Sequence, residues 1–163
     1  MKQYQFENII SSAEYQRSNY EYQDKVVGGT SYYEINSSNY FVLVLNSIGT
    51  VFFRPFLWEV TSSAAVLSAI EALGFLLLTV YLFIKRGFLK PFQLIFQDPF
   101  LTMAFIFAIS FAIGVGISTA NFGALSRYKI PCLPFYLITI LIVYRKSGLN
   151  FPVWFNKILN FIK

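Results

Sequence analysis

The chain has 163 residues, of which 56% are hydrophobic and only 13% are charged, whereas a soluble domain has about 25% charged residues. Its formal net charge of +5 divides into net −2 for residues 1–35 and net +7 for the remainder. The basic residues stand at the ends of apolar runs rather than on a polar face, which argues against a nucleic-acid partner. With no histidine, His-based metal sites and Ser-His-Asp catalysis are excluded within this chain.

These proportions, with 20% aromatic residues, predict an all-α integral membrane protein whose main partner is the lipid bilayer. About three transmembrane helices are expected, together with interfacial amphipathic helices. The single cysteine, Cys132, excludes an internal disulfide. No cofactor is indicated, because a phosphate-cradling glycine loop, carboxylates at glycosidase spacing and cysteine-rich metal spacing are all missing.

Residues 1–38 are polar and rich in Tyr, Gln, Ser and Asn. Apolar side chains recur at helical spacing near the start, at Phe6, Ile9, Ile10 and Ala13, which predicts a short amphipathic helix within residues 5–23. We expect this segment to be extracytoplasmic. It is either a solvated tail or part of a loop of a longer protein.

Residues 39–60 begin with the apolar run YFVLVLNSIGTVFF, residues 40–53. Fourteen residues fall below the roughly 17 that a helix needs to cross a bilayer, so this segment is predicted to be interfacial or re-entrant. The aromatic cluster that follows holds Arg54 and Glu59 and suits the lipid headgroup level.

Residues 61–146 form the predicted transmembrane region, with spans at about 62–84, 100–120 and 128–144. The second is the clearest, because no charged residue occurs for 21 positions after Pro99, enough to cross about 30 Å of hydrocarbon. Asp98 and Pro99 predict its N-cap and first helical position. The third contains Pro131 and Pro134, so it either begins near Tyr128 with a kink or covers part of the bilayer.

The first span contains Glu71, an intramembrane carboxylate that costs about 2.5 kcal/mol or more unless it is protonated, paired or facing a polar cavity. It is either a packing group inside the bundle or a proton or substrate contact. The link 87–97 is predicted to lie along the membrane surface. Residues 147–163 are predicted to form an amphipathic helix on the cytoplasmic side.

The positive-inside rule orients these spans. Seven basic residues near the membrane fall on one side and only Arg54, Arg127 and Lys129 on the other, so the first side is predicted to be cytoplasmic. The polar N-terminal segment then lies outside. This placement leads us to expect that the chain corresponds to the C-terminal part of a larger multi-pass protein.

Two sequence motifs carry a family resemblance. The first is FFRPFLWE, residues 52–59, followed by a span containing AIEA, and the second is NFGALSRYKIPCLPF, residues 121–135. They resemble the C-terminal part of large bacterial polytopic membrane proteins associated with envelope-polysaccharide loci. In broad design that group is similar to O-antigen-polymerase-like and lipid-linked-sugar glycosyltransferase proteins. The resemblance implies a bacterial inner-membrane location and a part in cell-envelope glycan assembly or export.

The candidate binding residues are the outer-face set Arg54, Glu59, Arg127 and Lys129. Their cations are suited to the pyrophosphate of a lipid-linked sugar, and Glu59 or Glu71 would act as a base if burial raised its pKa. In the alternative interpretation Arg54 pairs with Glu59, while the other two cations reach lipid phosphates. No catalytic residue is assigned, and an enzymatic activity is left open.

Two other functions compete with glycan assembly. One is a non-catalytic membrane subunit that packs against other transmembrane helices. The other is a small transporter component, for which Glu71 is the candidate intramembrane polar residue.

Overall fold

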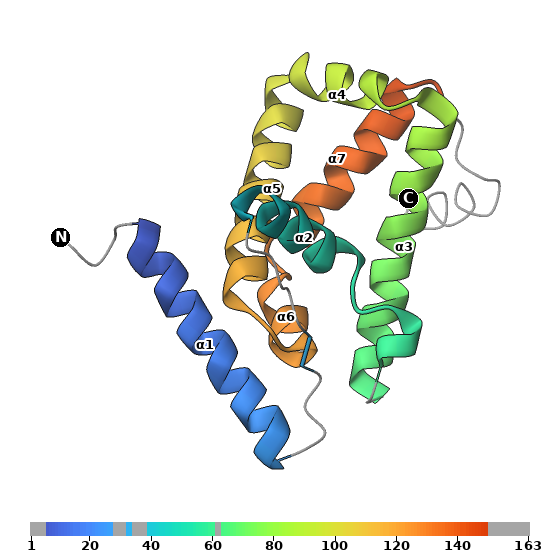
Figure 1. Cartoon of the computed structure of the whole chain (residues 1–163). Coiled ribbons are helices and arrows are strands. Elements are labelled where there is room, and N and C mark those ends of the chain that lie inside the picture. Colours follow the sequence, from blue (N-terminus) through green and yellow to red (C-terminus); the bar gives the residue numbers. More distant parts are fainter. Residues whose placement is uncertain (1–5, 28–31, 34–38, 61–62, 150–163) are drawn as a thin grey trace.

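The computed structural model describes residues 6–27, 32–33, 39–60 and 63–149 (Figure 1). Over these residues the chain is helical, and strand-like pairing is limited to an isolated bridge between Tyr32 and Asn121. The elements in chain order are α1 (Phe6–Val27), α2 (Tyr40–Phe53), the 3-10 helix η2 (Leu57–Glu59), α3 (Ser63–Arg86), α4 (Leu89–Phe96), α5 (Pro99–Ser118), α6 (Phe122–Tyr128) and α7 (Leu133–Lys146). The predicted all-α class is confirmed.

Two helices are long and apolar enough to cross a membrane. They are the Ala65–Arg86 part of α3, with a mean hydropathy of 2.1, and α5, with 2.3. A third crossing requires α6 and α7 to act together as one broken span. The two helices are bent by 67° relative to each other. Residues 128–144 are therefore not a single straight helix. The break falls at residues 129–132, where Pro131 and Pro134 disfavour helical backbone at the residues before them.

α5, α7 and α3 lie side by side with α7 in the middle, and α4 runs across one end of them (Figure 1). α6 and η2 lie at the opposite end. The predicted cap of α5 is confirmed, because Asp98 accepts hydrogen bonds from the amides of Phe100 (3.0 Å) and Leu101 (3.4 Å), with Pro99 at the first helical position. Lys146, at the end of α7, donates to the same carboxylate and ties α7 to the start of α5.

α2 packs across the C-terminal half of α5 (Figure 1). Gly116 of α5 makes the crossing possible. A Cβ atom at that position would lie 2.6 Å from the Cβ and 2.7 Å from the Cα of Ser47 on α2. Beyond the crossing, the Phe52 ring stacks on Tyr136 of α7 with centroids 3.9 Å apart. The C-terminal part of α2 is thus built into the core, whereas Tyr40, Phe41 and Leu45 near its start are exposed.

α1 is longer than the short helix that the sequence pattern predicts, and it lies against the C-terminal half of α5 (Figure 1). Arg17 makes the contact by donating from Nε to the carbonyl of Ile117 and from Nη2 to that of Gly116, both at 2.9 Å. These are terminal carbonyls of α5, where helix geometry leaves acceptors free and favours a positive charge. The C-terminal amphipathic helix is predicted over residues 147–163, of which residues 150–163 lie outside the described part of the chain.

Candidate functional site

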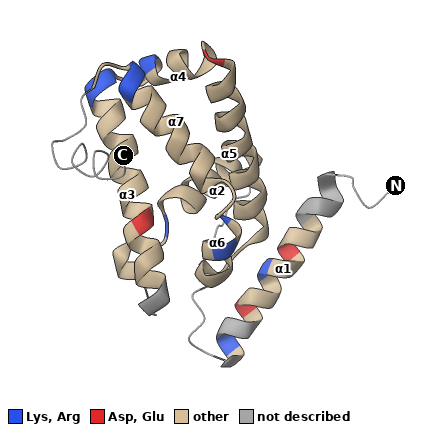
Figure 2. Ribbon diagram, turned by 180° about the vertical axis from the view of Figure 1, so that it is seen from behind, with Lys and Arg blue, Asp and Glu red and all other residues tan. Residues whose placement is uncertain are grey.

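The charged side chains are divided between the two ends of the bundle. Figure 2 shows basic residues gathered around α4 and the ends of α3 and α7, while Arg127 lies on α6 at the other end. The first group brings together residues far apart in sequence, namely Lys85, Arg86, Lys90, Arg145 and Lys146. The predicted outer-face set lies toward the opposite end, but it does not form one cluster.

Arg54 and Glu59 form an ion pair across the turn between α2 and η2. Arg54 Nε lies 3.1 Å from each carboxylate oxygen of Glu59, and Nη2 also donates to Oε1. Glu59 Oε2 accepts a further hydrogen bond from the Phe56 amide at 2.8 Å. The Arg54 guanidinium carbon lies 5.2 Å from the ring centroids of both Tyr33 and Phe122, within cation–π range. Arg54 is thus held on several sides by the protein.

The electrostatics of Glu59 do not suit a general base near neutral pH. Burial alone raises the pKa of Glu59, but the hydrogen bonds from Arg54 and the Phe56 amide outweigh burial, so that its pKa is lowered from its ordinary value. The condition under which Glu59 would act as a base, a pKa raised by burial, is therefore not met. Its place in the structure is that of a partner that fixes Arg54.

Lys129 pairs with Glu71, not with the other outer-face residues. The Lys129 side chain is 1% exposed, and its Nζ lies 3.6 Å from Glu71 Oε2. At that distance the pair is an ion pair without a hydrogen bond, and Nζ has no hydrogen-bond partner in the described part of the chain. The Glu71 side chain is 44% exposed on the outside of α3. Lys129 is therefore inaccessible to a ligand, whereas Glu71 is open on one side.

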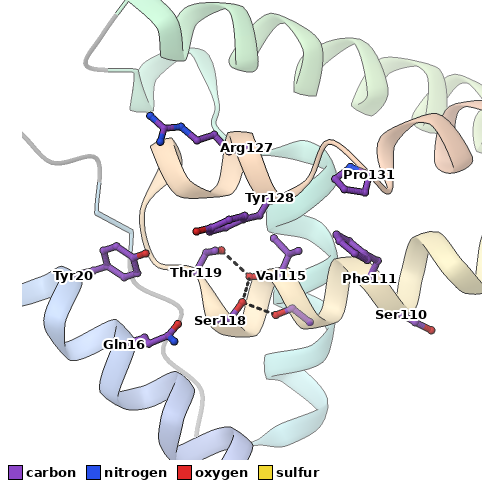
Figure 3. Close-up of a pocket in the computed structure, with 11 residues that line it drawn as sticks. Gln16, Tyr20, Ser110, Phe111, Val115, Ser118, Thr119, Arg127, Tyr128 and Pro131 are labelled. Carbon is purple, nitrogen blue, oxygen red and sulfur yellow. Dashed lines mark hydrogen bonds between the residues drawn. The ribbon is translucent and has the colours of Figure 1, made fainter.

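Arg127 is exposed and lines an open cavity of about 780 Å³ (Figure 3). Gln16 and Tyr20 reach this cavity from α1 and face Thr119 and Tyr128 across it. The remaining lining residues are Ser110, Phe111, Gly114, Val115, Ser118 and Pro131. Polar and aromatic groups from three separate helices thus surround one space, with a single cation among them.

The hydroxyl groups on the α5 side of this cavity are oriented by the helix end. Ser118 Oγ donates to the Gly114 carbonyl at 2.8 Å, and Thr119 Oγ1 donates to the Val115 carbonyl at 2.7 Å. Thr119 Oγ1 also lies 3.0 Å from the hydroxyl of Tyr33. Ser118 is partly exposed, and because its hydroxyl donates to a backbone carbonyl, the oxygen lone pairs remain as acceptors for a ligand's hydroxyl groups. Thr119 is 1% exposed, so its hydroxyl is closed to a ligand.

The sequence pattern indicates Arg127 as a candidate contact but not the other residues of this cavity. Gln16 and Tyr20 are one helical turn apart, so the spacing shows that they share a face of α1, yet nothing in the sequence shows what that face meets. The anchor that brings them there is Arg17, whose partners are backbone carbonyls. Such acceptors have no sequence signal.

Comparisons with protein-family models, with curated protein sequences and with solved structures found no match to this chain. Among the described residues no group of three or more Cys, Asp and Glu side chains is placed to hold a metal ion. The site is therefore judged from its own geometry.

Proposed function

We propose that this chain is a membrane-embedded component that binds an anionic lipid-linked sugar during assembly or export of cell-envelope glycan. The observation that supports the proposal is the cavity between α1, α5 and α6, which Arg127 lines together with Tyr20, Tyr128 and the partly exposed Ser118. An arginine fork matches the oxygens of a phosphate group. Tyrosine rings offer a sugar both a flat apolar face and a hydroxyl group.

The proposal narrows the predicted set of four residues to one ligand contact. Arg54 is committed to Glu59, and Lys129 is buried behind Glu71. Arg127 is exposed, and no ion pair or hydrogen bond with another described residue occupies its guanidinium. It is thus the member of the set that is free to meet a pyrophosphate.

The distribution of charge supports an extracytoplasmic position for the cavity. Basic residues of the α4 end would face the cytoplasm of a bacterial inner membrane under the positive-inside rule, which puts Arg127 on the outer side. The motif at residues 121–135, which carries the resemblance to envelope-polysaccharide proteins, includes Arg127, Tyr128 and Pro131 of the cavity wall. Both points agree with a lipid-linked substrate presented at the outer leaflet.

Binding of polyprenyl pyrophosphate to the full chain in nanodiscs tests this proposal. We expect Arg127→Ala to weaken binding about tenfold or more, because a hydrogen bond to a charged group contributes roughly 1.5–3 kcal/mol. Arg145→Ala is the matched control, since it removes the same charge from an exposed position at the other end of the bundle. Equal affinity of the Arg127→Ala and Arg145→Ala variants would refute the proposal, as would equal binding of uncharged polyprenol.

A second function, a non-catalytic subunit that packs against other membrane helices, is favoured by one face of α3. Large apolar residues stay exposed there, with Leu67 at 73% and Ile84 at 75%. Glu71 and Gly74 lie among the exposed residues of the same helix, and nothing lies within 4 Å of a Cβ placed on Gly74. Small and polar residues are typical of helix contacts in membranes.

Cysteine cross-linking separates the two functions. Because Cys132 is buried, a cysteine placed at Gly74 would be the accessible thiol of the chain. The subunit hypothesis expects Gly74→Cys to form a cross-linked species in native membranes. Ile106→Cys, at an exposed position of α5, serves as the control. If the two variants cross-link equally or not at all, the α3 face is not a specific contact.

A further inference from the structure

A second and more enclosed cavity, of about 250 Å³, lies between α2, α3, α5 and α7, next to α4. Its walls are apolar apart from Thr79, Tyr136 and Thr139. These three are satisfied within the protein. Thr79 Oγ1 lies 2.9 Å from the Tyr136 hydroxyl, and Thr139 Oγ1 donates to the Phe135 carbonyl at 2.8 Å. A cavity of this kind has no free polar group to hold water and is suited to an apolar occupant.

The wall of the cavity nearest α4 is a group of phenylalanine rings. The ring centroids of Phe88, just before α4, and Phe92 of α4 lie 5.2 Å apart, and that of Phe92 lies 6.1 Å from Phe83 of α3 and 6.0 Å from Phe105 of α5. Phe88 is largely exposed, so the group extends from the cavity to the surface. This gives an apolar path from the basic end of the bundle into the space between the helices.

The volume of the cavity suits part of a hydrocarbon chain. An engineered cavity of roughly 150 Å³ in another protein stays dry and takes up benzene, so 250 Å³ accommodates several more carbon atoms. The remaining length of the hydrocarbon chain would continue along the phenylalanine rings.

The positive charge around α4 indicates that a ligand with a hydrocarbon chain would also carry a negatively charged headgroup. In the sequence Lys85 and Arg86 precede Phe88, and Lys90 lies between Phe88 and Phe92. The basic residues of α7 gather at the same end of the bundle (Figure 2). The acid described there, Asp98, is already paired with Lys146. The Nε atom of Arg86 is buried and has no hydrogen-bond partner among the described residues. This end therefore offers uncompensated positive charge to a phosphate group.

We propose that this cavity is a binding site for an anionic membrane phospholipid, with one acyl chain between α3, α5 and α7 and the headgroup phosphate on Lys85, Arg86 and Lys90. The site is distinct from the Arg127 cavity, which lies at the other end of the bundle. It needs neither the proposed sugar ligand nor an activity. It would place a structural lipid at the cytoplasmic end of the orientation given above.

Native mass spectrometry of the detergent-purified chain, with phosphatidylglycerol or phosphatidylcholine added, tests the site. We expect the wild-type chain to retain phosphatidylglycerol several-fold more than phosphatidylcholine. Ile109→Trp fills the cavity from its lining and should abolish that retention. Ile106→Trp changes the same residue type on an exposed position of the same helix and should leave retention unchanged.

A separate variant tests the proposed contact between the lipid headgroup and the basic residues. Combined Lys85→Ala and Lys90→Ala should reduce the preference for phosphatidylglycerol to near parity with phosphatidylcholine while some lipid is still retained. If Ile109→Trp does not fold, Ile109→Phe with Ile106→Phe as control replaces the pair. The proposal is overturned if the variants at 109 and 106 retain lipid equally, if the wild type shows no preference, or if polyprenyl phosphate displaces phosphatidylglycerol at equal concentration.

Discussion

The ion pair between Lys129 and Glu71 allows a direct test of how a buried charge contributes to the stability of this helical bundle. The two side chains differ in environment, because Lys129 is fully buried and Glu71 is open on the outside of α3. At 3.6 Å their attraction is about 5 kcal/mol for an effective dielectric constant of about 20. The cost of removing the Lys129 ammonium from water is several kcal/mol and offsets most of this attraction.

This difference predicts unequal effects when one partner is removed. Glu71→Gln leaves a buried ammonium without its counter-charge and should destabilise the fold by about 3 kcal/mol, the lower end of the range for a broken buried pair. Lys129→Met removes the buried charge and keeps the side-chain volume, so its cost should stay below about 1 kcal/mol. The double variant should be close to the wild type, which corresponds to a coupling of about 3 kcal/mol or more in magnitude.

The chain carries a convenient reporter for this measurement. Cys132 is its single cysteine and is buried, so a thiol-reactive dye responds when the bundle unfolds. Unfolding in mixed micelles with a rising fraction of denaturing detergent would be followed for the wild type, both single variants and the double variant. Our reasoning is refuted if Lys129→Met destabilises more than Glu71→Gln, or if the two effects add without coupling.

Two further predictions concern the contacts that join the helices. Gly116→Ala should destabilise the fold by about 1–3 kcal/mol, because the added Cβ would lie 2.6 Å from Ser47 Cβ. Gly114→Ala is the control, since nothing lies within 4 Å of a Cβ added there, and it should be neutral or slightly stabilising in the same unfolding assay. Equal effects at the two glycines would contradict the close crossing. Asp98→Ala should lower the unfolding midpoint at pH 7 by removing the α5 cap and the partner of Lys146.

The Asp98 contribution should also depend on pH. The hydrogen bond from Lys146, together with those from the backbone amides, lowers the pKa of Asp98. A carboxylate with a lowered pKa in the folded state stabilises the fold above its ordinary unfolded value near 4 and loses that contribution as the pH falls through the folded value. The difference in unfolding midpoint between wild type and Asp98→Ala should therefore be constant from pH 7 down to about 5 and shrink in more acid solution. A difference that grows on acidification would contradict this sign.

The sequence by itself determined the helical class, the apolar helices and the cap of α5. These features depend on neighbours in the chain. A run of 20 apolar residues satisfies its backbone within one helix, and Asp98 followed by Pro99 caps the helix that starts there. The same local chemistry pointed to the break near Pro131, although the 67° bend between α6 and α7 was not foreseeable. How these helices meet requires information that no local pattern contains.

Only the tertiary structure decided which charges are free. Arg54, Arg127 and Lys129 look alike in sequence, each a cation beside an apolar segment. In the fold one is held by Glu59 and two aromatic rings, one is buried behind Glu71, and Arg127 alone opens onto a cavity. The Arg17 anchor that places α1 at this cavity joins a side chain to backbone carbonyls about 100 residues away. Backbone carbonyls are the same in every residue, so the sequence does not show which of them Arg17 meets.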